Sequence, residues 1–326
     1  MRILVTGGAG YVGSVSVERL VEAGHAVTVL DNLVTGHRSN TEGTAELVDR
    51  SFGDRDLVAR LLREHRVDAV LHCGARSLVA QSVADPALYY NENVVGGIRL
   101  LDAMRDAGVD RLVFSSTAAV YGAPESIPIR EDDPTRPMNP YGETKLAIER
   151  AMRWYSVYGL RTISLRYFNV AGASELHGED HSPETHLIPN ILAAALDGTA
   201  VTLFGNDYPT PDGTNIRDYI HVVDLADAHI AALERTGASE PGFEAINLGS
   251  GGGFSVLDVL RAAESVVGRP IAHTLGPRRA GDPPVLVASN ERAAQLLGWH
   301  PARGTLEAMI GSTWTWTQRH RDGERP

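Results

Sequence analysis

Cysteine is almost absent from this chain of 326 residues, since Cys73 is the only one. A single thiol cannot form an intramolecular disulfide, and the chain has no cysteine cluster for a structural metal. We therefore expect a reducing, cytoplasmic setting and no metal site. Long apolar runs are also missing, because none approaches the roughly 20 residues that span a bilayer. The opening run from Met1 to Thr6 leads straight into a glycine-rich motif, which argues against a cleaved export signal and leaves no membrane segment expected.

Positive charge is scarce as well. The sequence has 30 Lys and Arg against 41 Asp and Glu, which gives a formal net charge of −11. This charge opposes nonspecific attraction to nucleic acid, so we expect no nucleic-acid partner. An anionic small molecule would need a local cationic pocket. Hydrophobic residues make up 43% of the chain, enough to bury a substantial core in one large or two smaller domains.

What the chain does contain is an alternation of strand and helix patterns. Apolar residues 2–6 precede glycines, a helical apolar pattern follows to Val21, and a short apolar run at 26–30 ends at Asp31. Later strands are expected near 46–50, 68–72, 111–115 and 161–166, and helices near 56–65, 87–107 and 141–158. This order predicts an α/β fold with a doubly wound, Rossmann-like parallel sheet covered by helices on both faces.

The glycine-rich motif lies between the first predicted strand and the first predicted helix. Its pattern is G-x-x-G-x-x-G, in which missing side chains allow a tight turn, close approach of a pyrophosphate and close packing of helix on strand. Asp31 follows at the end of the next strand, where a carboxylate can accept a hydrogen bond from a ribose hydroxyl and would repel a 2′-phosphate. The alternatives are an ordinary tight turn and a turn-forming Asp31. We predict an NAD site whose loop residues are Gly7, Gly10, Tyr11, Val12 and Gly13.

Tyr141 and Lys145 are four residues apart, which places both on one face of a helix. A nearby ammonium lowers the pKa of a phenol from its usual value of about 10, and we expect Lys145 to act on Tyr141 in this way. Thr117 follows a strand at the carboxyl edge of the sheet, where its hydroxyl can hold a substrate oxygen while Tyr141 exchanges a proton with it. Taken singly, Thr117 would be a turn hydroxyl, Tyr141 a half-buried aromatic and Lys145 a solvated charge. Together behind a dinucleotide loop they predict hydride and proton transfer.

After about residue 170 the elements become shorter and are interrupted by Gly and Pro, as in 205–213. We expect a dinucleotide-binding domain at 1–170 and a smaller, mainly substrate-binding domain at 171–326. A helical pattern from Asp224 to Ile230 predicts that a segment near 220–248 returns to the first domain.

With these motifs the chain resembles the extended short-chain dehydrogenase/reductase superfamily and, within it, the UDP-glucose 4-epimerase family. The resemblance is nearly end to end, and residues 204–222 are its most specific part. Beyond the glycine loop and Tyr141-x-x-x-Lys145, the matching segments are 87–94, 165–172, 204–210, 212–214, 217–222, 247–249 and 277–282.

The resemblance implies an isomerase of galactose and carbohydrate metabolism that interconverts UDP-glucose and UDP-galactose. In this family, tightly bound NAD takes a hydride from sugar C4 and returns it after the 4-keto intermediate rotates. Tyr141 would be the acid and base, with Thr117 at a position filled by Ser in many relatives. The resemblance also implies a homodimer through the helices near 87–107 and 141–158. Apolar residues on the first of these could equally be internal core: Val94, Ile98, Leu101 and Met104.

Binding residues follow from the resemblance position by position. The implied NAD contacts are Asp31, Asn32, Asp54, Arg55, Cys73, Gly74, Ala75, Asn93, Lys145 and Phe168. The implied contacts to the nucleotide sugar are Thr117, Tyr141, Asn169, His186, Leu187, Phe204, Arg217, Tyr219, Arg279 and Asp282. Arg217 and Arg279 also suit the chemistry, because a guanidinium fork matches a diphosphate. We interpret His221 as structural.

Two positions depart from the family pattern. Ser77 stands where many relatives carry Lys, which removes one ammonium near the cofactor and leaves Arg76 as a candidate substitute. Leu286 occupies a position where a bulky Tyr is associated with exclusion of N-acetylated sugars and a small residue with acceptance. UDP-N-acetylhexosamines and UDP-pentoses therefore remain alternative substrates.

Other reactions on the same scaffold are disfavoured by single positions. Related 4,6-dehydratases usually carry acids directly after the threonine, and UDP-uronate decarboxylases commonly carry a carboxylate in the same segment. Here Ala118 and Ala119 follow Thr117. A non-catalytic NAD-binding regulator would keep the glycine loop, but retention of Thr117, Tyr141 and Lys145 argues against it.

Overall fold

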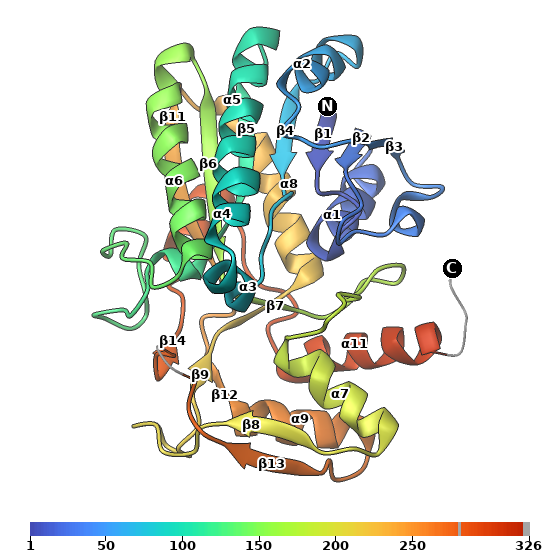
Figure 1. Cartoon of the computed structure of the whole chain (residues 1–326), viewed down its shortest axis with the longest axis vertical. Coiled ribbons are helices and arrows are strands. Elements are labelled where there is room, and N and C mark those ends of the chain that lie inside the picture. The colour runs from blue at the N-terminus through green and yellow to red at the C-terminus, as the bar shows by residue number, and fades with distance from the viewer. Residues whose placement is uncertain (280–281, 322–326) are drawn as a thin grey trace.

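A parallel sheet of seven strands forms the upper part of the molecule (Figure 1). The computed structural model describes residues 1–279 and 282–321, so Ala280 and Gly281 of the matching segment at 277–282 lie outside the described residues. In sheet order the strands are β11 (Gly242–Leu248), β6 (Arg161–Tyr167), β5 (Arg111–Thr117), β4 (Ala69–His72), β1 (Arg2–Thr6), β2 (Ala26–Asp31) and β3 (Glu46–Asp49). The strand order reverses between β1 and β4, and such switch points are where open parallel sheets bind ligands. The predicted fold class is confirmed.

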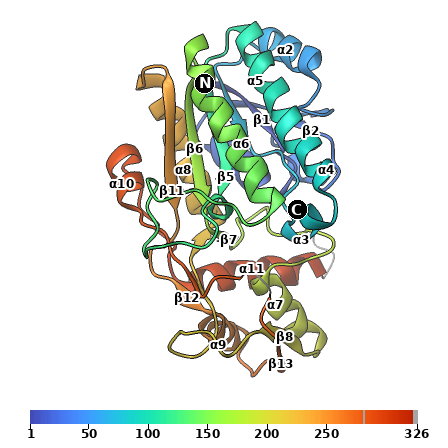
Figure 2. The same ribbon diagram turned by 60° about the vertical axis from the view of Figure 1, so that its left-hand side comes forward.

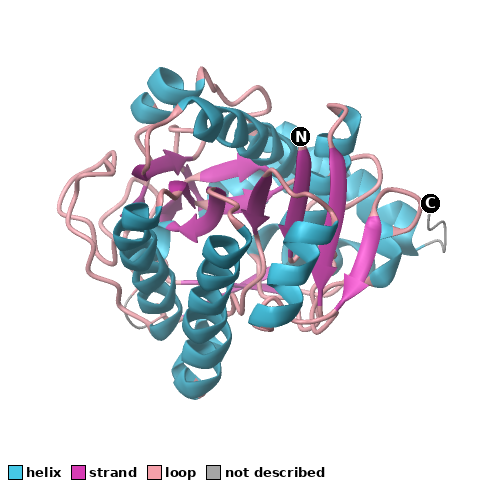
Figure 3. Cartoon of the chain, turned by 90° about the horizontal axis from the view of Figure 1, so that it is seen from above, coloured by secondary structure: helices cyan, strands magenta, loops and turns pink. Residues whose placement is uncertain are grey.

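Helices cover both faces of the sheet, as the view from above shows (Figure 3). Alternation along β1 explains why: Ile3 and Val5 pack into one buried cluster, and Leu4 packs into the other. The first cluster is covered by α1 (Tyr11–Glu22) and α8 (Val222–Ala238), and the second by α2 (Arg55–Glu64), α5 (Gly96–Ala107) and α6 (Pro140–Tyr155). The sheet is therefore buried on both sides, as its continuous apolar strands predict.

The helix expected near 87–107 has three geometries in succession. It begins as α4 (Pro86–Tyr89), widens into a π-helical turn at Tyr90–Val95 and continues as α5. π-Helical turns occur often at functional sites. This one carries Asn93, whose amide bonds the backbone of Arg76 at 2.8 and 3.0 Å. The helix expected at 141–158 ends earlier, at Tyr155, and a 3₁₀ turn follows at Ser156–Tyr158.

Short elements build the lower part, which has its own buried cluster including Ile191, Leu192, Val259 and Met309 (Figure 1). Its helices are α7 (Leu187–Asp197), α9 (Val256–Val267) and α11 (Leu306–Arg321). Its strand pairs and small sheet comprise β7 (Asn169–Ala171) with β10 (Tyr219–His221), β8 (Val201–Phe204) with β13 (His273–Gly276), and β12 (Phe254–Ser255) with β9 (Ile216–Arg217) and β14 (Val285–Leu286). Shorter helical pieces are α3 (Val79–Ala84), α10 (Glu291–Leu297) and 3₁₀ turns at Arg38–Thr41 and Ala118–Val120.

The chain passes between the two parts more than once. After β6 it enters the lower part, and it returns through α8 and β11, which pairs with β6 along its whole length (Figure 2). It descends again to β12 and α9, and α10 then packs against α8 and β11. Among the described residues, no helix combines the length and the apolar character needed to cross a bilayer.

Candidate active site

A cavity of about 1390 Å³ opens at the carboxyl ends of the sheet strands and extends to the lower part of the molecule. This volume exceeds the roughly 300–1,000 Å³ of a typical small-molecule pocket, so it has room for two large ligands. The predicted residues that line it are Gly7, Gly10, Tyr11, Val12, Gly13, Asp31, Asn32, Cys73, Gly74, Ala75, Thr117, Tyr141, Lys145, Phe168, Asn169, His186, Leu187, Phe204, Arg217, Tyr219, Arg279 and Asp282. Their location agrees with the predicted roles, which themselves stay predictions.

Three predicted cofactor contacts have other partners. Asp54 caps α2 by accepting from the Leu57 amide at 3.1 Å, and Arg55 pairs with Asp106 at 2.5 Å. Both line a neighbouring hollow of about 560 Å³ instead of the main cavity. Asn93 is buried and braces Arg76. As contacts of NAD these three remain predictions; in the structure Asp54 and Asn93 support neighbouring backbone, and Arg55 forms a surface ion pair with Asp106.

The glycine loop is shaped by close backbone contacts. A side chain at Gly13 would place its Cβ 1.9 Å from the Gly7 carbonyl oxygen, so only glycine lets α1 pack so close to the loop. At Gly10, a Cβ would meet only that carbonyl oxygen, at 3.5 Å, and Gly10 also lines the cavity. No side chain caps α1, so its first amide groups are available to an anion. The loop therefore fits the diphosphate of a dinucleotide.

Asp31 ends β2 beside this loop and is buried. Its two oxygens accept from the backbone amides of Ala9, at 3.0 Å, and Leu33, at 2.8 Å. Burial raises the pKa of the carboxyl, and the two amide bonds oppose that change. Each oxygen keeps a further lone pair, so Asp31 can still accept from a ribose hydroxyl.

The predicted catalytic residues come together from two elements. Thr117 ends β5, and Tyr141 stands in the first turn of α6, where Asn139 accepts from the Gly142 amide at 2.9 Å. The Thr117 hydroxyl lies near the Tyr141 phenol and acts to lower its pKa. Lys145 is buried, donates to the Ser115 carbonyl at 2.7 Å and lies 6.0 Å from the centre of the Tyr141 ring.

We expected the Lys145 ammonium to lower the pKa of Tyr141, and the structure does not show this effect. Burial raises the pKa of Tyr141 to about 12, and the influence of the Thr117 hydroxyl only partly opposes it. Burial also lowers the pKa of Lys145 to about 8. The prediction was wrong for the protein alone because it ignored burial, which disfavours both charged forms. A cation bound beside the phenol would favour the phenolate.

Behind these residues lies a buried ion pair that the sequence analysis missed. Arg166 of β6 donates to Glu149 of α6 at 2.6 Å, and Glu149 also accepts from Ser116 at 2.6 Å and Ser164 at 2.8 Å. The pair thereby joins α6, which carries Tyr141, to the strand end that carries Thr117. The available signal was spacing, because Glu149 follows Lys145 by one helical turn.

Two arginines face the cavity from the lower part. Arg217 pairs with Asp282, which also accepts from Asn215 at 2.7 Å. The Arg279 guanidinium lies over the Phe204 ring, 4.4 Å from its centre. The structure thus brings two guanidinium groups to the cavity wall, where they can bind an anionic ligand.

The positions that depart from the family pattern also border the cavity. Its lining includes Arg76 and Ser77 near the cofactor loop, Ala118 and Ala119 after Thr117, and Leu286 on β14. His221, in contrast, accepts from the Val223 amide at 3.1 Å and contacts the Ser312 hydroxyl at 3.1 Å, which agrees with a structural role.

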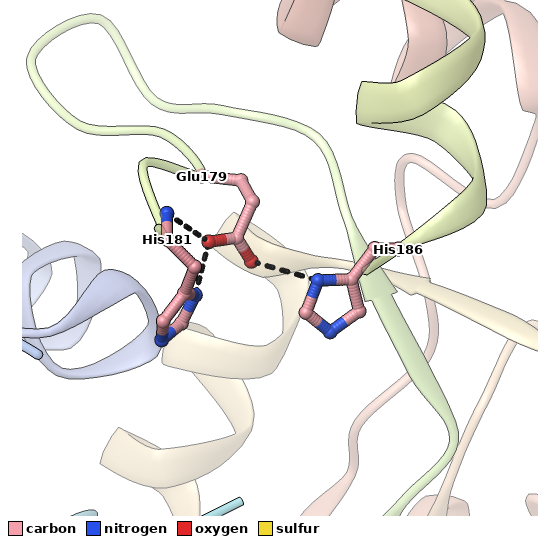
Figure 4. Close-up of side chains that lie close together, drawn as sticks. All are labelled: Glu179, His181 and His186. Atoms are coloured by element: carbon pink, nitrogen blue, oxygen red, sulfur yellow. Dashed lines mark hydrogen bonds and ion pairs between the residues drawn. The ribbon is translucent and has the colours of Figure 1, made fainter. Parts of the chain in front are cut away.

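A histidine and glutamate cluster in the same wall was not predicted. Glu179, His181 and His186 lie together on the loop between β7 and α7, with His186 preceding the first turn of α7 (Figure 4). The sequence analysis named only His186, as a substrate contact, and expected no metal. Glu-x-His followed by His-x-x-x-x-His at 179–186 was the signal it passed over.

Comparison with known proteins agrees with this geometry. Residues 3–249 match the model of the NAD dependent epimerase/dehydratase family. A UDP-glucose 4-epimerase of Lacticaseibacillus casei is 49% identical over 327 residues, covering 99% of this chain and 98% of that protein. The crystal structure of UDP-glucose 4-epimerase from Brucella ovis in complex with NAD superposes with a TM-score of 0.93 at 42% identity, covering 97% of this chain and 98% of that one. A UDP-glucose-4-epimerase from Stenotrophomonas maltophila with bound NAD and formylated UDP-arabinopyranose gives 0.95 at 40% identity, covering 99% of both chains.

Proposed function

This chain belongs to the NAD dependent epimerase/dehydratase family, and on that premise we propose that it is a UDP-glucose 4-epimerase that uses NAD. It interconverts UDP-glucose and UDP-galactose, which makes it an isomerase. The observation that carries this conclusion is the single cavity shared by the glycine loop, the Tyr141 group and the arginines of the lower part. One space therefore serves a dinucleotide and a nucleotide sugar together.

The residues present fit NAD. The open side of Gly10 and the uncapped start of α1 would hold the diphosphate, and Asp31 would accept from a ribose hydroxyl. When bound, NAD supplies a nicotinamide that accepts a hydride from sugar C4 and returns it. The positive charge of oxidised nicotinamide beside Tyr141 would also offset the burial that raises the pKa of this phenol.

Proton transfer is the part played by the chain itself. Tyr141 takes the proton of the C4 hydroxyl and later gives it back to the same oxygen, so its protonation state is restored in each cycle. Thr117, which lines the cavity with Tyr141, would hold that oxygen in line. Lys145, whose ammonium lies 6.0 Å from the centre of the Tyr141 ring, would reach the nicotinamide ribose.

The lower part of the molecule would anchor the substrate. We assign the diphosphate to Arg217 and Arg279, whose guanidinium groups can each donate two parallel hydrogen bonds. Arg217 would exchange part of its contact with Asp282 for phosphate oxygens, because both compete for the same donors. A fixed nucleotide leaves the sugar free to present either face of C4 to the catalytic residues.

Elimination of water, the other chemistry of the family, lacks support at the positions where it would be expected. Ala118 and Ala119 line the cavity directly after Thr117 and carry no acid or base. Epimerisation needs no further proton-transfer group there.

The division of labour along the chain is also a proposal. Residues 1–170 and the returning segment near 220–248 would form the NAD-binding domain, and the remainder of 171–326 would bind the substrate. The two upper buried clusters and the separate lower cluster support this division. We place the enzyme in the cytoplasm, where the Cys73 thiol beside the cofactor loop stays reduced.

We also propose a homodimer, through a different set of side chains than expected. Leu101 and Met104 belong to the buried core, so they cannot make an interface. The exposed apolar residues at the end of α6 are Trp154 at 77%, Val157 at 78% and Tyr158 at 55%. Light scattering of the wild type should give twice the chain mass, and Trp154→Glu should shift it towards the monomer. A wild type that stays monomeric at working concentration would contradict the dimer.

The experiment that tests the function uses the protein as purified, without added NAD. The wild type should convert UDP-galactose to UDP-glucose, whereas Tyr141→Phe should fold, retain NAD and lose kcat by about 10²–10⁴-fold. Tyr158→Phe is the matched control, because it removes only a hydroxyl outside the cavity lining, keeps the ring of the proposed dimer contact, and should leave full activity. Full activity of Tyr141→Phe would refute the catalytic role, and an inactive wild type that holds NAD would favour a binding protein.

A further inference from the structure

We propose that Glu179, His181 and His186 form a binding site for a divalent transition metal of the zinc class. One ligand atom from each residue lies within 4.8 Å of the others (Figure 4). The site occupies the loop between β7 and α7, in the wall of the large cavity. It shares His186 with the predicted contacts of the nucleotide sugar, but the proposal does not depend on the epimerase chemistry.

The donor atoms already lie about as close together as the ligands of a bound metal ion. His186 Nδ1 lies 3.5 Å from one Glu179 oxygen, and His181 Nδ1 contacts the other oxygen. Zinc bonds of about 2.0–2.1 Å in a tetrahedron separate neighbouring ligands by roughly 3.3 Å. Small side-chain movements would therefore open the cluster around an ion. Two imidazoles and a carboxylate form a common zinc ligand set that leaves a fourth position open.

A fourth protein donor stands next to the cluster. Glu184 lies 2.7 Å from His186 Nδ1 and accepts from the backbone amides of Thr185 and His186, each at 2.6 Å. These bonds fix the carboxylate in place before any ion arrives. Ligand-supporting hydrogen bonds of this kind are typical of metal sites. Glu184 or a water molecule would complete the tetrahedron.

Charge gives an independent reason for a cation at this point. The Glu179 side chain is only 6% exposed, yet it faces a cavity that must take two diphosphates. Glu179 and Glu184 pair with His181 and His186, and where these histidines are neutral the carboxylates would repel anionic ligands. A bound divalent cation neutralises them when the histidines are uncharged.

The loop is held before the cluster and within it. Ser174 donates to Glu18, and His37 of the N-terminal half contacts the Asp180 carbonyl at 3.2 Å. A metal would add a direct link from residues 179 and 181 to the start of α7. We therefore expect metal binding to stabilise this wall of the cavity.

The test uses the enzyme with its bound NAD, without a histidine tag and after treatment with a chelator. Titration calorimetry with Zn²⁺ should show one site per chain, and Co²⁺ should produce the visible absorption of a tetrahedral complex. His181→Gln and Glu179→Gln should each weaken the affinity by about 10–100-fold. Loss of an outer group that only supports a ligand typically costs this much, so this is the smallest loss to expect when a ligand itself is lost.

His300→Gln is the matched control, because His300 is exposed and lies outside the cavity. It should bind both metals like the wild type. NAD content and circular dichroism verify that each variant is folded. Failure of the wild type to bind Zn²⁺ stoichiometrically, or equal binding by His181→Gln, would overturn the proposal and leave the cluster as hydrogen bonds alone. Either result is independent of whether Tyr141 acts as the base.

Discussion

The molecule has two ion pairs between an arginine and a carboxylate, one beside the sheet and one in the lower part. The two pairs have different roles. Arg166 and Glu149 expose only 6% and 2% of their side chains, and serines fill the remaining acceptor positions of Glu149. Arg217 and Asp282 expose 13% and 24% and line the cavity. The first pair is enclosed by protein, whereas the second borders the space where a ligand enters.

This difference separates holding a site in place from binding a ligand. A buried pair cannot exchange partners without leaving a charge unpaired, so Arg166 and Glu149 fix the geometry of Thr117, Tyr141 and Lys145. A pair at a cavity wall can exchange a carboxylate for a phosphate at little cost. The upper part is thus the rigid half of the site and the lower part is the exchangeable half.

The largest effect should come from breaking the enclosed pair. Arg166→Met leaves the buried Glu149 charge without its partner and should lower the free energy of unfolding by about 3–5 kcal/mol. Urea unfolding measures this change. Arg217→Met is the matched control and should lose clearly less, because its partner Asp282 stays partly in contact with water. Equal losses would erase the distinction between the two pairs.

The second effect should appear in substrate binding. Arg217→Lys keeps the charge but loses the planar fork, and we expect the KM for UDP-glucose to rise by about 10–100-fold with kcat little changed. This corresponds to about 1.4–2.7 kcal/mol at 1.4 kcal/mol per tenfold. Arg278→Lys, at a surface pair with Asp207, should leave KM within about twofold. An unchanged KM in Arg217→Lys would place the diphosphate elsewhere.

The third effect should be a loss of stability of the rigid half at acidic pH. Burial lowers the pKa of His229, held by Ser16 at 3.0 Å, to about 3, and that of His72 also to about 3. Because these folded values lie below the unfolded value of about 6.5, their stabilisation is complete above pH 6.5 and declines as pH falls towards 3. Each histidine contributes a slope of up to about 1.4 kcal/mol per pH unit.

Urea unfolding of the wild type and of His229→Gln between pH 7 and pH 5 measures this slope. The variant should lose less stability than the wild type as the pH falls, because it lacks one buried group that must take up a proton on unfolding. Identical slopes would show that His229 is not held neutral in the folded protein.

The smallest effect concerns sugar selectivity in the exchangeable half. Leu286→Tyr should lower the ratio of rates with UDP-N-acetylglucosamine and UDP-glucose, and Leu286→Ala should raise it, each by about tenfold or less. Leu286 lines the cavity, whereas Leu275 is 55% exposed and outside it, so Leu275→Tyr is the control. If both Leu286 variants left the ratio unchanged, the sugar would not reach β14.

The sequence predicted the residues of the rigid half better than those of the exchangeable half. In the rigid half, strand ends fix where side chains lie, so the glycine loop, Asp31, Thr117 and Tyr141 could all be located from motif and period. The π-helical turn could not be foreseen, because its sequence differs little from that of an ordinary helix. The pKa of Tyr141 was misjudged because burial depends on packing from several elements at once.

In the exchangeable half, residues such as Arg217 and Arg279 were reached only through family resemblance. Strands of two residues leave no period to follow. The contacts between Glu179, His181 and His186 depend on a loop conformation that no local pattern specifies. Motifs therefore located the residues, but the structure was needed to show which of them contact each other.

The return of the chain to the sheet limits how this protein can be cut. A fragment ending at residue 170 would lack β11, and β6 would then present a bare edge with unpaired backbone groups. It would also lack α8, which buries the apolar face of α1. Functional division and folding unit do not coincide here, so a chimera with a new substrate half must keep the segments on both sides of the insertion.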